Sequence, residues 1–375
     1  MKVLYASFDE VPSFKGASTH ILSSSRASVR AHELHLVTLG GVTLPRLYGL
    51  RHHPQPLTEP NYLRRGLAFR ARVACIAHDI RPDVGHFRSP WEGIALLDAG
   101  VPCVYEVNGL PSLELQQTYR DIPASAVSIF RDWETRCLRQ ARIVICPSPR
   151  IRDHLVSAYD ATIAHKVHVV PNGYDLVPAL GPRVGSSLRM VYLGTLHPWQ
   201  GLFRILRGLV ELGDRVTLDV YAPSNRAWQP LLEKRILRYG LSLRVKLHRP
   251  MHRARLAATL PSYDLGIAPL LKTERNTTQG CDPIKILDYL SHGLPVVAPD
   301  LFVARQALTH ELNGLLYAAD DVRSFVAAVV RLDEDRALLR RLRDHAQPSL
   351  RARPTWAQHG EHISSLYESL VSFDA

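Results

Sequence analysis

Short β-branched runs alternate with longer amphipathic segments along the chain, and this alternation occurs in two successive blocks. A buried run followed by a segment of helical period is the pattern of a parallel sheet covered by helices. In the first block the predicted strands are residues 2–7, 35–38, 84–87, 103–107, 143–146 and 167–170. In the second block they are residues 190–193, 217–221, 245–247, 265–268, 296–298 and 314–317. The pattern therefore predicts an α/β protein with two Rossmann-like domains, each a doubly wound parallel sheet.

The two blocks are separated by residues 173–187, which are rich in turn-forming residues and lack hydrophobic periodicity. Such a segment is typical of a linker between domains. Apolar residues at helical spacing return over residues 320–345 and 356–370. We therefore predict domains at residues 1–175 and 176–352, followed by a helix within residues 353–375 that docks back on the first domain.

Length and composition agree with two ordinary domains, because 375 residues exceed the size at which one hydrophobic core keeps growing. No run approaches the roughly 20 apolar residues that span a bilayer, and the first residues lack the design of a secretory signal. The five cysteines are scattered without metal-ligand spacing, which favours a reducing compartment. A cytoplasmic protein is therefore expected.

Basic residues outnumber acidic ones by 46 to 35, which gives a net charge of +11. A surplus of this size suits nucleotide phosphates, an anionic membrane or nucleic acid. Nucleic-acid binding is not expected, because no run interleaves aromatic with basic residues. The Arg-rich residues 63–72 are best interpreted as the solvated face of a helix, while peripheral contact with the inner face of an anionic membrane stays open.

The most informative segment is NTTQGCDPIKILDYLSHGLPVVA, residues 276–298. Asp282 suits an N-cap, Pro283 the first helical position and Gly293 the C-terminal cap, so a short helix over residues 283–291 is predicted. Its N-terminus would present free amide donors at the carboxyl end of the strand 265–268, where open α/β sheets bind ligands. A diphosphate fits this place.

Lys285 and Asp288 lie three residues apart and therefore share one face of the predicted helix. An ordinary surface ion pair is one interpretation. Because the helix begins at a phosphate-competent loop, we favour another: Lys285 offsets phosphate charge, and Asp288 accepts hydrogen bonds from ribose hydroxyls.

Four further segments accompany this one in a characteristic order. They are KGASTH at residues 15–20, VYEVNG at 104–109, VVPNGYD at 169–175 and VYLGTLHPWQG at 191–201. Together with GCDPIKILDYL at residues 280–290, their order and spacing resemble glycosyltransferase family 4. The similarity extends over nearly the whole chain.

The resemblance implies the GT-B architecture, with the acceptor on the N-terminal domain and the nucleotide-sugar donor on the C-terminal domain. It also implies that the anomeric configuration of the sugar is retained. Lys285 is the implied catalytic cation. The implied donor-binding residues are Gly16, Gly194, Thr195, Gln200, Gln279, Gly280, Cys281, Asp282, Pro283, Ile284 and Asp288.

The chain departs from the family pattern at three of these positions. A glutamate is usual where Gly280 stands, and cations are usual at the positions of Thr195 and Gln200. Backbone groups of residues 279–282 are expected to hold the sugar instead, and Lys285 with helix-end amides to hold the diphosphate. Cys281 is equally well interpreted as a small buried apolar side chain.

In the first domain, Gly16 begins the first helix and allows a close approach of the backbone to a ligand. His20 lies one turn further, although a lone helical histidine is more often packed than catalytic. Many relatives place a histidine where Asn108 stands, and asparagine cannot shuttle a proton. Glu106 is therefore kept with Asn108 and His20 as a catalytic candidate. Trp91 and Glu92 are expected to line the mouth of the site.

The resulting prediction is a metal-independent hexosyltransferase without a cofactor, because no convincing Asp-x-Asp pair follows a strand. The donor is a nucleotide sugar, with UDP favoured over GDP, and the acceptor is a hydroxyl of a glycan, a lipid-linked sugar or a small natural product. Three alternatives stay open: a catalytically inactive sugar- or nucleotide-binding homologue, a GT-B epimerase and a GT-B phosphorylase. A dinucleotide oxidoreductase is disfavoured, because no Gly-x-Gly-x-x-Gly follows the first strand.

Overall fold

The computed structural model describes residues 1–45, 49–119, 122–177, 187–223, 225, 227–249, 251 and 253–372. Contacts between residues divide the chain into two compact units. The first unit contains residues 1–13, 17–172 and 356–375, and the second contains residues 14–16 and 173–355. Most of the predicted linker, residues 178–186, lies outside the described residues.

The first unit is built on a parallel sheet with the strand order β3-β2-β1-β4-β5-β6-β7 among the described residues. Its strands are β1 (Lys2–Glu10), β2 (Glu33–Leu39), β3 (Leu50–Gln55), β4 (Val84–Phe87), β5 (Cys103–Glu106), β6 (Ile143–Cys146) and β7 (Val167–Val169). The order reverses between β1 and β4, which makes the carboxyl ends of these two strands the switch point of a doubly wound sheet.

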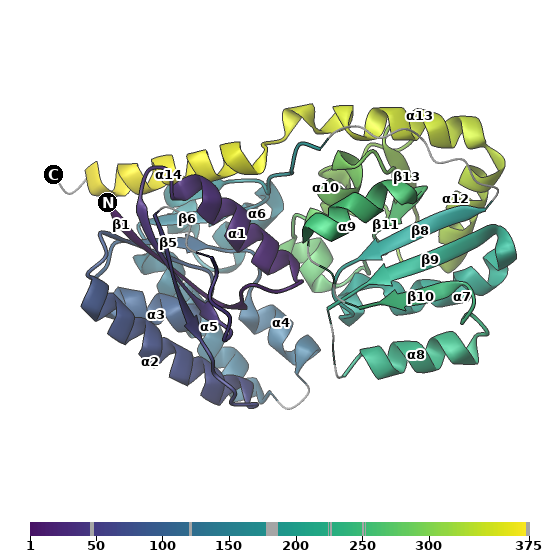
Figure 1. The fold of residues 1–375 in the computed structure, drawn as a ribbon. Coiled ribbons are helices and arrows are strands. Elements are labelled where there is room, and N and C mark those ends of the chain that lie inside the picture. The colour runs from purple at the N-terminus through teal and green to yellow at the C-terminus, as the bar shows by residue number, and fades with distance from the viewer. Residues whose placement is uncertain are drawn as a thin grey trace. The chain divides into compact units, whose positions relative to one another are not determined.

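Helices cover both faces of the first sheet (Figure 1). They are α1 (Gly16–Ser28), α2 (Tyr62–Ile80), α3 (Pro90–Asp98), α4 (Pro111–Thr118), α5 (Ala124–Gln140), α6 (Pro149–Ala158) and α14 (Trp356–Ser372). One apolar core joins the sheet to α2, α3 and α5, and a second core joins its other face to α1 and α14. The C-terminal helix α14 thus completes the core of the first unit, and Tyr367 Oη lies 2.5 Å from His86 Nδ1 on β4.

The second unit repeats this design with the strand order β10-β9-β8-β11-β12-β13 among the described residues. Its strands are β8 (Leu188–Leu193), β9 (Val216–Tyr221), β10 (Val245–His248), β11 (Leu265–Ile267), β12 (Val296–Pro299) and β13 (Gly314–Tyr317). All neighbouring strands are parallel, and the order reverses between β8 and β11. The second switch point therefore lies beyond the ends of β8 and β11.

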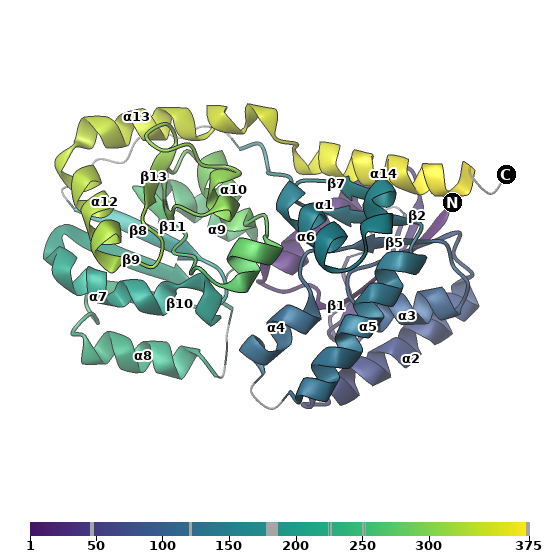
Figure 2. The ribbon, with the colours of Figure 1, turned by 180° about the vertical axis from the view of Figure 1, so that it is seen from behind.

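Helices also cover both faces of the second sheet, as the view from behind shows (Figure 2). They are α7 (Leu202–Leu212), α8 (Gln229–Arg238), α9 (Arg253–Thr259), α10 (Ile284–Ser291), α11 (Phe302–Arg305), α12 (Val322–Glu334) and α13 (Arg336–Ala346). The cores on the two faces consist only of residues of this unit. Two Rossmann-like parallel sheets confirm the predicted fold class.

One strand of the first sheet, β3, is missing from the sequence prediction. Its residues, LRHHPQ, contain two histidines and a proline and show no run of β-branched side chains. Proline and polar residues are tolerated there because, among the residues that the structure describes, β3 pairs with β2 alone and forms the edge of the sheet.

Among the residues described, no helix is long and apolar enough to cross a membrane. Within the same residues, no group of three or more His, Cys, Asp or Glu side chains is placed to hold a metal ion.

Candidate active site

Two loops of the second unit follow the strands at which its sheet reverses direction. Residues 194–201 follow β8, and residues 268–283 follow β11 and lead into α10. Ligands of doubly wound sheets bind at this switch point, beyond the carboxyl ends of the strands. All the predicted donor-binding residues except Gly16 and Asp288 lie on these loops or at the start of α10.

Lys285, in the first turn of α10, reaches across to the loop that follows β8. Its Nζ donates a hydrogen bond to Gln200 Oε1 at 2.6 Å and lies 4.4 Å from the centre of the Tyr192 ring. Among the described residues, no carboxylate lies within ion-pairing distance of this ammonium, so the surface pair with Asp288 is not formed. Burial lowers the pKa of Lys285 to about 7, and the nearby Arg275 acts in the same direction. A cation in these surroundings is stabilised when an anion binds beside it.

Gly194 makes room for the Lys285 side chain. Its φ angle is +138°, and a Cβ atom at this position would lie 2.8 Å from Lys285 Nζ. A larger residue would therefore strain the backbone and displace the ammonium. Next to it, the carbonyl of Thr195 accepts a hydrogen bond of 2.5 Å from Tyr192 Oη, which fixes the ring beneath Lys285.

The two loops are held together at short distances. Asn276 Nδ2 donates to the carbonyls of Trp199 at 3.0 Å and Leu271 at 2.8 Å. Gly201 has a φ angle of +74°, and a Cβ atom there would lie 1.7 Å from the carbonyl oxygen of Pro269. Only glycine allows this approach, which in turn positions Gln200 opposite Lys285.

The loop after β8 also carries His197, which the sequence analysis did not single out. Its ring stacks on Trp199 with centroids 4.4 Å apart, and the Arg275 guanidinium lies 5.5 Å from the Trp199 ring. Burial, with the charges of Lys15 and Arg275, lowers the pKa of His197 to about 4, so the ring is neutral at physiological pH. Among the described residues its buried Nδ1 atom has no hydrogen-bond partner.

The segment before α10 differs from the prediction in one respect. The N-cap position is occupied by Pro283, without a side-chain cap, and the helix begins at Ile284. Asp282 is not an N-cap because its carboxylate instead forms a buried ion pair with Arg353. Gly293, with a φ angle of +70°, follows the helix as predicted.

The other residues that were predicted to bind the donor are mostly buried. Cys281 packs in an apolar cluster with Leu270, Leu301 and Val303, in agreement with the apolar interpretation of its thiol. Gly280 has a φ angle of +86°, which disfavours any side chain. Gln279 is fully buried, and neither polar atom of its amide has a hydrogen-bond partner among the described residues. On α10, Asp288 is 8% exposed. Gly16 groups with the second unit, where a Cβ atom on it would lie 3.9 Å from Ile284 Cδ1.

In the first unit, Glu106 lies at the end of β5 and is 2% exposed. Its carboxylate contacts five polar side chains, namely Tyr5 (2.8 Å), His86 (3.1 Å), Arg88 (3.5 Å), His20 and Asn108. Burial alone would raise the pKa of Glu106, but the charges of His20 and Arg88 and the hydrogen bonds from His20 and His86 hold it well below its usual range. Glu106 is therefore an ionised, fully engaged carboxylate.

His20 and Asn108 are held by this carboxylate. His20 is 3% exposed, lies 2.8 Å from Asn172 Oδ1 through its Nδ1 atom, and packs edge-on against Trp356 and His359. Asn108 is half-buried and donates its amide N–H to Glu106. Because the amide nitrogen faces the carboxylate, the carbonyl oxygen of Asn108 is left to accept a hydrogen bond.

Comparison with known proteins relates both units to enzymes of sugar transfer. Residues 14–177 match the model of Glycosyltransferase Family 4, and residues 187–335 match that of Glycosyl transferases group 1. The chain belongs to the family 4 type of glycosyltransferases.

Solved structures of low sequence identity share the GT-B fold of this glycosyltransferase. Sucrose-phosphate synthase from Thermosynechococcus elongatus is 15% identical with a TM-score of 0.83, and the match covers 99% of each chain. HepE from Anabaena, in complex with UDP and glucose, is 18% identical with a TM-score of 0.76 and coverage of 98% of this chain and 100% of its own. WaaG, a glycosyltransferase involved in lipopolysaccharide biosynthesis, is 13% identical with a TM-score of 0.77 and coverage of 97% and 99%. No curated protein matched the sequence of the chain.

Sequence reasoning missed Asp9 and Arg88 at the switch point of the first unit. Arg88, directly after β4, donates to Asp9 Oδ2 at 3.0 Å, and Asp9 lies near the end of β1. Glu92 accepts hydrogen bonds from the backbone N–H groups of Phe8, Arg88 and Ser89 and so fixes the turns that follow both strands. The only signal in the sequence is the position of these residues after predicted strands.

The expectation that Trp91 and Glu92 line the mouth of a site is wrong. Trp91 is 2% exposed, and Glu92 is fully buried. Their positions follow from local structure, because Ser89 and Glu92 form a capping box at the start of α3 and Trp91 packs against Phe130 and Trp133. Burial raises the pKa of Glu92 to about 7.

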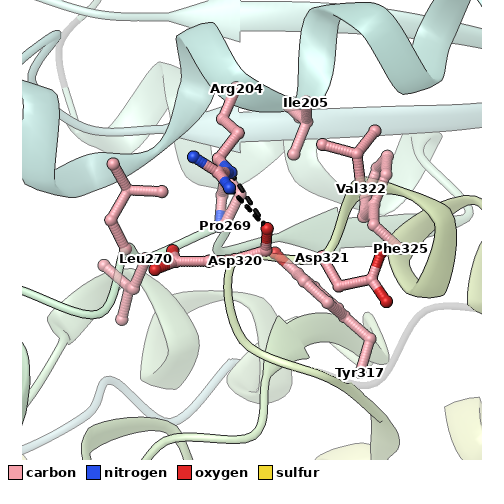
Figure 3. Close-up of a pocket in the computed structure, with 10 residues that line it drawn as sticks. Arg204, Ile205, Pro269, Leu270, Tyr317, Asp320, Asp321, Val322 and Phe325 are labelled. Carbon is pink, nitrogen blue, oxygen red and sulfur yellow. Dashed lines mark hydrogen bonds between the residues drawn. The ribbon is translucent and has the colours of Figure 1, made fainter.

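A separate shallow hollow lies in the second unit at the starts of α7 and α12 (Figure 3). Apolar side chains such as Ile205, Leu270 and Phe325 surround Arg204, whose guanidinium donates to the carbonyl of Asp320 at 2.7 and 3.1 Å. None of the predicted site residues lines it.

Proposed function

We propose that this glycosyltransferase moves a sugar from a nucleotide-sugar donor to an acceptor hydroxyl with retention of configuration. UDP is the favoured nucleotide, and GDP is the next. The observation that carries the proposal is Lys285, a cation at the switch point of the second unit that has no carboxylate partner within the described part of the chain. A diphosphate placed there would supply the missing negative charge.

Two further observations support a nucleotide sugar as the donor. The two loops that meet at the switch point are fixed by Asn276 and Gly201, so a ligand would bind to a preformed surface. Structures of the similar HepE contain UDP and UDP-glucose. That protein is a distant relative by sequence, and its ligands indicate the class of donor to test first.

The absence of cations at Thr195 and Gln200 makes Lys285 the centre of diphosphate binding. Gln200 takes part indirectly, because its amide oxygen holds the ammonium in place at 2.6 Å. When the diphosphate binds, we propose that Lys285 Nζ turns from the uncharged amide oxygen of Gln200 toward the phosphate oxygens. The departing diphosphate is then stabilised by electrostatic interaction as positive charge develops on the anomeric carbon.

In the proposed mechanism the acceptor hydroxyl attacks from the face that the diphosphate leaves, and its proton passes to a departing phosphate oxygen. No protein nucleophile, metal ion or cofactor takes part in this route. Glu106 would not accept the proton, because its pKa is well below the usual range and its oxygens are engaged by five side chains. We assign Glu106 and His20 to positioning, and Asn108 to binding a hydroxyl through its carbonyl oxygen.

The acceptor in this proposal is a hydroxyl of a glycan, a lipid-linked sugar or a natural product. Cytoplasmic location and peripheral contact with an anionic membrane remain part of the proposal. Sedimentation with vesicles that contain phosphatidylglycerol would test the membrane contact.

Substitution of Lys285 tests the proposed donor site. We expect Lys285→Ala to reduce turnover of a UDP-sugar at least about 100-fold, as for the loss of one electrostatic donor in other active sites. Lys285→Arg keeps the charge and should retain more of the activity. The exposed lysine in Lys246→Ala serves as a matched control, because it lies on the edge strand β10. Turnover of Lys285→Ala equal to that of the control would refute the proposal.

An inactive nucleotide-binding homologue is the second candidate function. The observation that favours it is Gly280, whose lack of a side chain removes a usual contact to the donor sugar. Calorimetry with UDP and a coupled assay for released UDP separate the two functions. Binding without hydrolysis or transfer, over a panel of UDP- and GDP-sugars, would establish the second candidate.

A further inference from the structure

The first unit has its own switch point, beyond the carboxyl ends of β1 and β4, and several half-exposed side chains meet there. The pairing of β1 with β2 becomes irregular between Ser7 and Glu10, so Phe8 and Asp9 lie in the irregular part of the strand. Such irregularities redirect side chains at the rim of a sheet, often beside active sites.

Aromatic rings form one side of this place. Phe8 is half-buried and meets Tyr62 edge-on, with ring centroids 5.5 Å apart. Tyr62 in turn lies 4.9 Å from Tyr119, which is 37% exposed. Aromatic faces of this kind suit the apolar C–H face of a saturated ring.

Asp9 supplies the polar side. Both of its hydrogen bonds among the described residues go to one oxygen, Oδ2, from Ser7 Oγ at 2.9 Å and from Arg88 Nη1 at 3.0 Å. The side chain of Asp9 is 35% exposed, and its Oδ1 atom is left to accept a hydrogen bond from a ligand. Ser7 and Arg88 hold the carboxylate in one orientation.

The charges around Asp9 indicate a neutral ligand. Two guanidinium groups lie here, and both already have partners. Arg88 is shared between Asp9 and Glu106, and Arg65, 5.9 Å from the centre of the Phe8 ring, donates to the carbonyl of Glu59 at 2.7 Å. A phosphate or a sulfate would have to compete with these partners and would lie beside the Asp9 carboxylate. An acyl chain is equally unsuited, since it would cover Asp9 without offering it a hydrogen-bond donor. A ring with one apolar face and several hydroxyls satisfies both the aromatic side and the carboxylate.

We infer that Phe8, Asp9, Tyr62 and Tyr119 form an acceptor subsite for a neutral pyranose, with the sugar ring against the aromatic side chains and a hydroxyl bound to Asp9 Oδ1. The inference rests on the proposed function, because it assigns the acceptor of that reaction to the class of uncharged glycans. It favours a glycan acceptor over a phosphorylated sugar or an alkyl alcohol.

The test is saturation-transfer NMR of the full-length protein in the presence of saturating UDP. The probes are p-nitrophenyl glucoside, galactoside and mannoside in both anomeric forms, with glucose 6-phosphate and decanol for comparison. We expect at least one glycoside to bind saturably through its ring protons, and Asp9→Asn or Phe8→Leu to weaken it about tenfold, the loss of one good contact. Asp79→Asn, an exposed carboxylate on α2, is the matched control and should bind like the unmodified protein.

Two further measurements separate the possible failures. Thermal unfolding shows that the variants are folded, and calorimetry with UDP should give a dissociation constant within about twofold of the unmodified protein, as expected for separate sites. If UDP binds but no glycoside does, if decanol or glucose 6-phosphate binds more tightly, or if neither variant weakens binding, the subsite is refuted. If UDP does not bind, the proposed function fails, and glycoside binding still decides the subsite.

Discussion

The position of Lys285 could be predicted from the sequence, whereas its pKa could not. The spacing of residues 276–298 places a lysine in the first turn of a helix at a sheet edge, and the structure agrees. Its contacts come from strand β8, which carries Tyr192, and from the loop after it, which carries Gln200, 85 residues away in sequence. These contacts determine whether the ammonium is paired, so the sequence alone could not predict its lowered pKa.

Donor binding should therefore depend on pH through Lys285. The pKa of the free protein is lowered to about 7, and a bound diphosphate raises it again. Affinity is then complete below pH 7 and falls as the pH rises above 7, by up to about tenfold per pH unit, because binding must take up a proton. His197, with a pKa of about 4, stays neutral throughout.

Calorimetry with UDP-glucose between pH 6 and 9 measures this dependence, since this diester diphosphate does not itself titrate in the range. Buffers of different ionisation enthalpy report the proton uptake directly. Lys285→Arg should abolish both the uptake and the slope. An unchanged slope in this variant would show that another group is responsible.

Gln279 offers a second prediction at this scale. Its amide is fully buried without a partner among the described residues, which is costly unless a ligand satisfies it. We expect Gln279→Leu to maintain or raise the thermal midpoint of the free protein and to lower kcat/KM for the UDP-sugar about tenfold, the loss of one hydrogen bond. A lowered midpoint with unchanged kcat/KM would show that the amide serves only the fold.

Among the elements, β3 has a sequence that is not typical of a strand, and its histidines should make it sensitive to acid. His52 Nδ1 accepts a hydrogen bond from the backbone N–H of Leu44 at 3.1 Å, and its Nε2 lies 2.9 Å from Thr38 Oγ1 on β2. His53 lies 3.0 Å from His35 on the same pair of strands. The bond from Leu44 requires an unprotonated Nδ1, so the packed edge favours neutral histidine.

The edge strand should therefore lose stability in acid. Burial lowers the pKa of His52 to about 4, and the neighbouring His53 acts in the same direction. Since the native pKa lies below the unfolded value, this contribution is complete above pH 6.5 and is lost as the pH falls from about 6.5 toward 4. Urea unfolding at pH 7.5 and 5 measures the loss.

His52→Gln keeps a side chain that can reach Leu44 and Thr38 but does not titrate, so it should flatten this dependence. His165, which is exposed at the end of the turn before β7, provides the control as His165→Gln. Equal pH dependence in the His52 variant and the control would place the acid sensitivity elsewhere.

Most elements could be predicted because they carry their own signal. Twelve of the thirteen strands among the described residues were predicted. Most of the predicted runs are buried and rich in Val, Ile and Leu, whereas β3 is stabilised by its partner strand. The start of α10 was misplaced by one residue for a similar reason. Asp282 has the right chemistry for an N-cap, but Arg353, which is distant in sequence, engages its carboxylate.

The whole molecule consists of two units whose cores do not share residues. Two apolar cores belong to residues 3–170 together with 363–370, and two belong to residues 174–350. The last helix, α14, thus stabilises the unit that contains the N-terminus. Hydrophobic periodicity predicted that helix, while its partners required the structure, because they include side chains on β1, β2 and β4.

Separate cores predict separate unfolding transitions, which a matched pair of variants can assign. Ile363 on α14 is 1% exposed in the core of the first unit, and Leu342 on α13 is fully buried in the second. Each substitution by alanine should cost about 2–4 kcal/mol and lower only the transition of its own unit in scanning calorimetry. UDP-glucose should raise only the transition that Leu342→Ala lowers, because the proposed donor site lies wholly in the second unit. If either variant lowers both transitions equally, the two cores unfold as one cooperative block, and the donor would then stabilise the entire chain.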